Sequence, residues 1–160
     1  MGVNVAVMVV RDARVADFAP LGYRPTGMPI SGDVAASSRA ELSALQHDAH
    51  TVLLDAGYAW IDLGERVSGA LGRPVATALF GSTSDTWLFQ LDVPRRPQRR
   101  IVWSQGAIAD ETGARLPEEV DGPLDEEQLG RLLARVTGFP GDLDWLRASW
   151  QPLTFPEPSA

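Results

Sequence analysis

The chain has 160 residues, of which 44% are hydrophobic and 22% charged, a composition typical of a globular domain rather than a disordered segment. It contains no cysteine and no lysine, so disulfides, thiolate metal sites, thiol nucleophiles and Schiff-base lysines are all excluded. The net charge of −7 argues against a nucleic acid or an anionic membrane as the partner, because both bind positively charged surfaces.

The length suits one domain, and we expect a single compact domain over residues 1–155 with a tail at 156–160. The apolar run Val3–Val10 is too short to span a bilayer and follows no basic stretch, which favours a buried strand over a signal peptide. Arginine without lysine, together with many Ala, Gly, Val and Asp residues, is typical of a GC-rich bacterial genome. We therefore expect a cytoplasmic bacterial protein.

In the first third of the chain, the valine-rich run Val3–Val10 predicts a strand covered on both faces. Val15–Leu21 predicts two helical turns that end at Gly22. The segment Ser38–Glu41 has the form of a capping box, so we expect a short helix from there to about Ala49.

Two apolar runs follow, Thr51–Leu54 and Tyr58–Ile61, and they predict either a hairpin or one kinked strand. Asp62 is placed to cap a helix, which Gly72 and Pro74 end in the expected order. The apolar face of this helix is expected to consist of Leu63, Val67, Ala70 and Leu71.

The middle of the chain predicts consecutive strands. Val75–Phe80 is apolar, Gly81–Ser84 predicts a turn, and Asp85–Val93 alternates, with one face formed by Trp87, Phe89, Leu91 and Val93. After a loop at Pro94–Gln98, the strand Arg99–Ser104 returns with matching parity, and we expect Phe89 opposite Trp103. A further tight turn is expected at Glu111–Gly113.

The clearest helix begins at the cap Asp125, with Gln128 completing a capping box, and it ends at Gly138. Its apolar stripe is Leu129, Leu132, Leu133 and Val136, with Leu124 before the cap. Asp142 is expected to cap one more short helix that carries Leu143, Leu146 and Trp150, and Pro152 to begin the tail. These elements predict an α+β fold with an antiparallel or mixed sheet, hairpins in the middle of the chain, and helices packed mainly on one face.

The two histidines, His47 and His50, lie three residues apart and would share one face of the expected helix, where they could hold a metal together with an acid from elsewhere. No spacing marks a third ligand, so surface histidines near a helix end are the favoured interpretation. We therefore expect no metal site and no cofactor.

The hydroxyl-rich segment Gly81–Asp85 could cradle a phosphate or present a nucleophilic serine, but Asp85 stands where a nucleophile elbow needs glycine, so a turn is favoured. The acids between residues 118 and 127, and Asp142 and Asp144, could act as paired carboxylates, but they suit helix starts better. The five tryptophans could line a cleft, though their spacing favours the core. No catalytic residue is assigned.

One basic cluster stands out, formed by Arg95, Arg96, Arg99 and Arg100. Guanidinium groups suit carboxylate or phosphate partners, so these four residues are the candidate binding site. The alternative is a solvated loop between Pro94 and Pro97.

The residues support no family resemblance. The absence of cysteine and lysine chemistry, the acidic charge and the expected compact core favour a non-enzymatic domain that binds another protein. Such a domain could mask a basic partner, as an immunity or regulatory protein would. One alternative is a hydrolase that uses Ser or Asp/Glu with His47 or His50. The other is a small-ligand-binding domain lined by aromatic residues. The sequence leaves the partner and the oligomeric state open.

Overall fold

The computed structural model describes residues 4–37, 42–58, 63–138, 144 and 147–154. Its strands are β1 (Asn4–Val10), β2 (Ile30–Ser31), β3 (Leu42–His47), β4 (His50–Asp55), β5 (Val75–Gly81), β6 (Thr86–Asp92), β7 (Arg99–Ser104), β8 (Ala107–Thr112) and β9 (Ser149–Leu153). Its helices are η1, a 3-10 helix (Val15–Leu21), α1 (Gly32–Ser37), α2 (Gly64–Leu71) and α3 (Glu126–Thr137).

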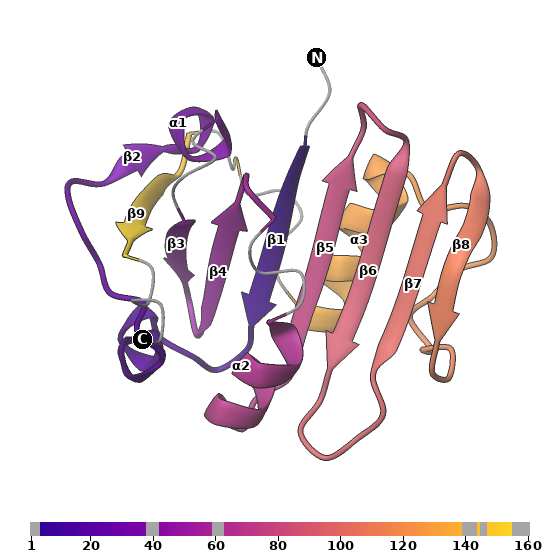
Figure 1. Cartoon of the computed structure of the whole chain (residues 1–160), viewed down its shortest axis with the longest axis horizontal. Coiled ribbons are helices and arrows are strands. Elements are labelled where there is room, and N and C mark those ends of the chain that lie inside the picture. Colours follow the sequence, from indigo (N-terminus) through magenta and orange to yellow (C-terminus); the bar gives the residue numbers. More distant parts are fainter. Residues whose placement is uncertain (1–3, 38–41, 59–62, 139–143, 145–146, 155–160) are drawn as a thin grey trace, which may run out of the picture.

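The strands form one open nine-stranded sheet in the order β2-β9-β3-β4-β1-β5-β6-β7-β8 (Figure 1). Every neighbouring pair is antiparallel, so the predicted α+β class is confirmed with an antiparallel rather than a mixed sheet. Strands β5 to β8 are joined by hairpins, as the middle of the sequence predicts.

The first strand lies near the centre of the sheet because both of its faces are apolar. Val5, Val7 and Val9 face one core, while Met8 and Val10 face a second core on the opposite side. Helices α1 and α3 pack over the first core, and η1 and α2 over the second. Figure 1 shows α3 behind the sheet and α2 in front of it. The helices therefore lie on both faces, not mainly on one, since each apolar face needs a cover.

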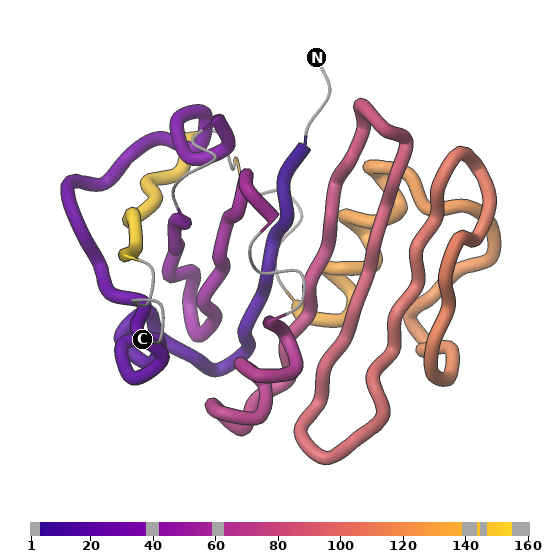
Figure 2. The backbone as a smooth tube through the Cα atoms, in the orientation of Figure 1, coloured from indigo at the N-terminus to yellow at the C-terminus, as the bar shows by residue number. Residues whose placement is uncertain are grey.

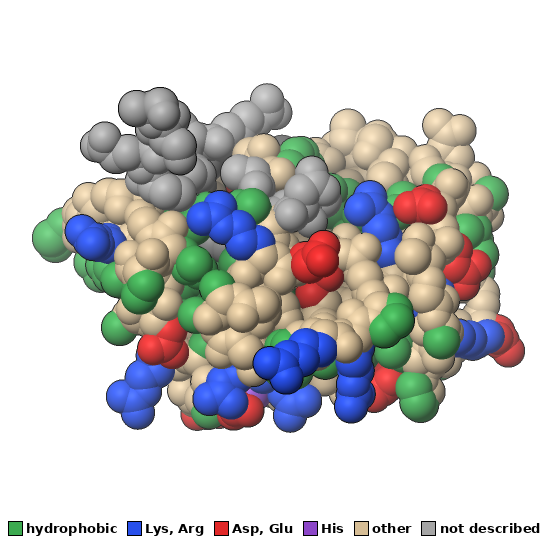
Figure 3. All heavy atoms as spheres, turned by 60° about the horizontal axis from the view of Figure 1, so that its bottom comes forward, with side chains coloured by type: hydrophobic (Ala, Val, Ile, Leu, Met, Phe, Trp, Pro, Cys, Tyr) green, Lys and Arg blue, Asp and Glu red, His purple; other side chains and the backbone are tan. Residues whose placement is uncertain are grey.

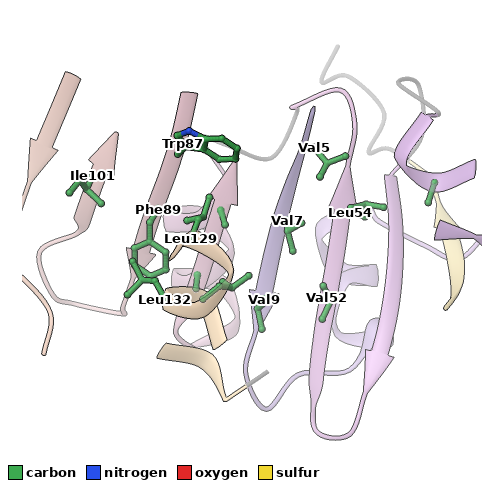
Figure 4. Packing of buried hydrophobic residues seen from close by; sticks show 14 of the residues in the cluster. Val5, Val7, Val9, Val52, Leu54, Trp87, Phe89, Ile101, Leu129 and Leu132 are labelled. Carbon is green, nitrogen blue, oxygen red and sulfur yellow. The ribbon is translucent and has the colours of Figure 1, made fainter. Parts of the chain in front are cut away.

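Helix α3 confirms the predicted cap, end and leucine stripe, while the Gln128 half of the predicted capping box is not seen. The Asp125 carboxylate accepts a 2.8 Å hydrogen bond from the backbone N–H of Gln128. Gly138 ends the helix at φ 71°. Its buried leucines pack against β5 and β6, and Figure 4 shows Leu132 beside Phe89. Within the described residues no helix is long and apolar enough to cross a bilayer.

The two shorter predicted helices near the second core are confirmed with changes. The turns at Val15–Leu21 form the 3-10 helix η1, and Gly22 ends it at φ 93°. Helix α2 ends at Gly72 as predicted, while its expected cap Asp62 lies outside the described residues. Ala70 is exposed, and Ser68 is buried in its place because its hydroxyl donates to the carbonyls of Arg73 and Asp92.

The expected helix from Ser38 to about Ala49 is wrong over its described part. Leu42–His47 is strand β3, and a turn with Asp48 at φ 49° joins it to β4. Leu42 and Ala44 alternate into the second core. The weak helical pattern of this segment is outweighed by its pairing with β4 and β9. The local sequence does not reveal this pairing. The segment 38–41 and the second apolar run, 59–61, lie outside the described residues.

The C-terminal prediction is also wrong where it can be compared. Trp150 lies in strand β9, not on a helix, and Pro152 belongs to that strand rather than to a tail. Strand β9 inserts between β2 and β3, so the end of the chain lies beside its first third (Figure 2). Residues 142, 143, 145 and 146 of the expected helix lie outside the described residues, as do 156–160.

Strands β6 and β7 share the predicted parity but not the predicted register. Phe89 pairs with Ile101, and Trp103 pairs with Trp87, so the expected Phe89–Trp103 pair is wrong by two residues. The connection includes all of Val93–Gln98, one residue longer than the predicted loop, and Leu91 is therefore opposite Arg99. A shift of two residues keeps the same side chains on the core face.

Candidate functional site

Strand β8 forms one edge of the sheet and is uncovered on both faces. All six of its residues, Ala107–Thr112, are exposed, and β7 is its only partner strand within the described residues. A two-residue turn at Gln105 and Gly106, with φ of 52° and 78°, joins β7 to β8. The turn expected at Glu111–Gly113 is therefore wrong for Glu111 and Thr112, which are the last two residues of β8.

A half-open pocket of about 240 Å³ lies between β7, β8, α3 and the connection from β8 to α3. Its apolar lining comes from Ile101, Trp103, Ile108, Val120, Leu124 and Leu132. Ile108 is 48% exposed and Val120 is 53% exposed, which makes them two of the few large hydrophobic side chains at the described surface. Exposed apolar side chains that are grouped and rimmed by polar residues are typical of interaction sites.

Arg99 is buried beside this pocket and holds the β8–α3 connection in place. It donates two parallel hydrogen bonds to Glu119, from Nε at 2.9 Å and from Nη2 at 2.6 Å. Its Nη2 also bonds Glu111 at 2.9 Å, and Nη1 bonds the carbonyls of Thr112 and Gly113. Gly113, at φ 80°, has to be glycine, because a Cβ there would overlap the Gln98 carbonyl. All of the guanidinium donors are thus used within the chain.

The Arg99–Glu119 pair shifts the pKa of both groups. The hydrogen bonds that Arg99 donates to Glu119 raise the pKa of Arg99 above its ordinary value and outweigh the opposing effect of burial. For Glu119, burial alone would raise the pKa, but the hydrogen bonds from Arg99 and the Leu116 amide lower it below the ordinary value. Both groups therefore stay charged near neutral pH, and Glu119 is unsuited to act as a general acid there.

The four arginines of the predicted binding cluster do not form one surface. Arg99 is buried and holds Glu119, as described above, and we call this group of contacts the Arg99 clamp. Arg100 points to the opposite face, where its Nε lies 3.3 Å from Asp110 and its Nη1 bonds Gln90. Only Arg95 and Arg96 lie exposed on the β6–β7 loop. Alternation along β7 separates the neighbours 99 and 100, which a count of charges along the sequence cannot reveal.

The net negative charge is concentrated around β8. Residues 107–127 contain eight acids and one arginine, a net charge of −7, while the rest of the chain has thirteen of each sign. Several of these acids have partners: Asp110 faces Arg100, Asp121 lies 2.7 Å from Arg115, and Asp125 caps α3. Glu118 and Glu126 remain exposed or half-buried with no ion pair within the described residues.

The two histidines lie on the β3–β4 hairpin, where His47 pairs across the strands with His50. His47 Nε2 lies 3.6 Å from Asp48, and the Asp12 amide faces His50 Nδ1 at 3.4 Å. Neither histidine lines the pocket beside β8. Among the described residues, no group of three or more His, Cys, Asp or Glu side chains is placed to hold a metal ion.

The hydroxyl-rich segment is a turn, as predicted, and several of its polar groups bond within the turn or to Asn4 and Trp87 beside it. Ser84 Oγ donates to the Gly81 carbonyl, Asn4 donates to Thr83, and Asp85 accepts from the Trp87 indole at 3.0 Å. Trp87 and Trp150 are buried in the core, while Trp103 is partly exposed at the pocket. Trp60 and Trp145 lie outside the described residues.

The sequence reasoning missed the parts of this site that come from β8 and the connection, namely Ile108, Glu119 and Val120. The available signal was the pair Gln105-Gly106, since glycine in the second position of a two-residue loop favours a hairpin. No protein-family model, curated protein or solved structure matches the chain. Inferences about its function therefore rest on the geometry and the charge of the described residues.

Proposed function

We propose that this chain is a non-enzymatic protein-binding domain of the immunity or regulatory type, and that β8 with the adjoining pocket contacts a basic partner. The observation that carries the proposal is the exposure of all six β8 residues beside a pocket with exposed Ile108 and Val120 at its rim. The surrounding segment 107–127 carries a net charge of −7, which favours a partner of the opposite sign.

An edge strand offers a row of backbone N–H and C=O groups to which another strand can add. Pairing between two copies of β8 is disfavoured because each copy would bring Asp110, Glu111 and the rest of the acidic segment close to the other. A bulge between Val102 and Trp103 further bends the edge. An extended basic segment of another protein suits this edge better than a second copy.

The pocket supports the binding of a side chain rather than a small molecule. Ligand pockets usually have volumes of roughly 300–1,000 Å³ and enclose most of the ligand. The pocket here is about 240 Å³ and half-open, with Trp103 and Leu132 among its apolar lining. It is suited to one apolar side chain of a partner, which would act as an anchor at the centre of the contact.

The hydrolase alternative draws less support from the same surface. The carboxylates at the pocket, Glu111 and Glu119, are engaged by Arg99, and the histidines lie on another part of the sheet. A general base needs a reactive group within hydrogen-bond reach, and neither His47 nor His50 is near the pocket lining.

The test is parallel affinity capture from the native host with three baits: the wild type, Ile108→Asp and Val34→Asp. Val34 is a matched control, because it is also 48% exposed but lies on α1. We expect a basic protein that is retained by the wild type and the control and is lost with Ile108→Asp. Binding of the purified pair should weaken at least tenfold, since anchor residues cost about 2 kcal/mol or more. Equal capture by all three baits would contradict the proposal.

A further inference from the structure

A row of exposed arginines lies along one rim of the sheet, away from the pocket. We call this the arginine rim and define it as Arg11, Arg73, Arg95 and Arg96. Figure 3, in which the lower rim of Figure 1 is turned forward, shows several arginine side chains along the lower part of the view, with some Asp and Glu side chains among them. None of the four rim arginines lines the pocket beside β8.

Strand pairing explains why residues so far apart in the sequence share this rim. Val10, the end of β1, pairs with Val75, the start of β5, and Val75 in turn pairs with Asp92, the end of β6. Arg11, Arg73 and the loop with Arg95 and Arg96 therefore extend from adjacent strands. Neighbouring strands lie about 4.8 Å apart, so these arginines are close enough to act together.

These arginines differ from others in the chain in their lack of acidic partners. Arg99, Arg100, Arg115, Arg131 and Arg147 each form an ion pair, whereas no ion pair joins the rim arginines to an acid within the described residues. The acids on the chain segments at this end of the sheet are Asp12, Asp17, Asp48 and Asp92. Two of them have other roles: Asp17 accepts from the Arg14 amide, and Asp92 is buried between Gln90 and Gln98.

We propose that the arginine rim binds an acidic surface of a different protein, not of a second copy of this chain, and that this contact is separate from the one at β8. Guanidinium groups bind carboxylates through two parallel hydrogen bonds, and several of them in a row suit a series of Asp or Glu side chains. A nucleic acid suits the rim less well. No Phe, Tyr or Trp lies among the described residues of its loops, 11–14, 47–50 and 93–98, for bases to stack on.

The proposal is tested with a fluorescein-labelled glutamate homopeptide, whose binding is followed by fluorescence anisotropy at low and at physiological salt. The variant Arg95→Glu/Arg96→Glu is compared with Arg131→Glu/Arg147→Glu, which changes the net charge by the same amount away from the rim. We expect the rim variant to lose roughly tenfold or more in affinity at low salt, and the control to change less than about twofold. Wild-type binding should weaken as salt rises, because the contacts are exposed.

Three outcomes would overturn the proposal. The first is equal affinity of the rim variant and its control for the peptide, or no binding by the wild type. The second is tighter, rim-dependent binding of a single-stranded DNA of matched charge, which would assign the rim to nucleic acid. The third is salt-sensitive self-association of the wild type by sedimentation that the rim variant abolishes, which would make the acidic segment of a second copy the occupant. Unchanged melting temperatures of both variants exclude unfolding as the cause of any loss.

Discussion

The centre of the sheet and its β7–β8 end both consist of antiparallel strand pairs, but they are covered differently. Strands β1, β4 and β5 contribute side chains to two cores, one on each face. At the β8 end, α3 and the connection 113–124 reach only as far as the pocket, and the edge strand is exposed throughout. The same type of strand thus stabilises the fold in one place and offers a contact surface in another, because only covered apolar area adds stability.

The largest expected effect lies at the centre. Phe89→Ala removes a fully buried ring that packs against α3, and it should lower the free energy of unfolding by about 3–5 kcal/mol. Trp103→Ala should cost less despite the larger ring, because Trp103 is only partly buried at the pocket. Urea unfolding of the two variants checks the order. A larger loss for Trp103→Ala would mean that the β7–β8 end contributes as much as the centre.

The Arg99 clamp ties the β8–α3 connection to β7 at the uncovered end of the sheet, and its loss should rank second. Arg99→Met leaves the Glu119 carboxylate, only 7% exposed, without its cation, and should destabilise the fold by about 3 kcal/mol. The double variant Arg99→Met/Glu119→Leu should regain part of this loss, because no charge then remains buried. Thermal unfolding of both variants is the measurement. No recovery in the double variant would show that shape, rather than charge, is what the clamp supplies.

The same clamp predicts a pH dependence confined to acid conditions. Since the folded state lowers the pKa of Glu119, the stabilisation is fully present above the ordinary value of 4.5 and is lost as pH falls through the folded-state pKa. Glu119→Gln should therefore flatten the stability profile below that value and leave its shape near neutrality unchanged. Denaturant midpoints measured across the acid range test this. An unchanged acid slope in Glu119→Gln would contradict it.

A smaller effect is expected at the start of α3. Asp125→Ala removes the side-chain acceptor for the Gln128 amide and should destabilise the protein by about 1 kcal/mol. Asp125→Asn keeps an acceptor and should cost less. A melting temperature unchanged in the alanine variant would mean that the cap does not contribute.

The smallest effect on stability is expected at the uncovered edge. Ile108→Asp should change the free energy of unfolding by no more than about 0.5 kcal/mol, because the side chain is half exposed. The same change should abolish partner capture, so this variant should lose binding while it keeps its stability. A destabilisation like that of Phe89→Ala would show that Ile108 belongs to the core and would remove the basis for a contact surface.

Local patterns in the sequence predicted much of the fold but less of the candidate site. Strands β1, β5, β6 and β7 follow from apolar runs and alternation, and α3 from its cap, its stripe and Gly138. The four arginines of the predicted binding cluster do not share one surface, because closeness in the sequence does not decide the face on which a side chain lies. Arg99 and Arg100 are neighbours in sequence, yet the strand places them on opposite faces with different acids.

What the sequence by itself determined is therefore what depends on a few adjacent residues: caps, helix ends at Gly22, Gly72 and Gly138, and the period of each strand. Only the tertiary structure decided that β3 and β9 are strands, since Leu42 pairs with Leu153 from the other end of the chain. It also decided the β6–β7 register, the cover on both faces, and the gathering of four arginines on one rim. These features come from pairings between distant segments, whose energy no local pattern contains.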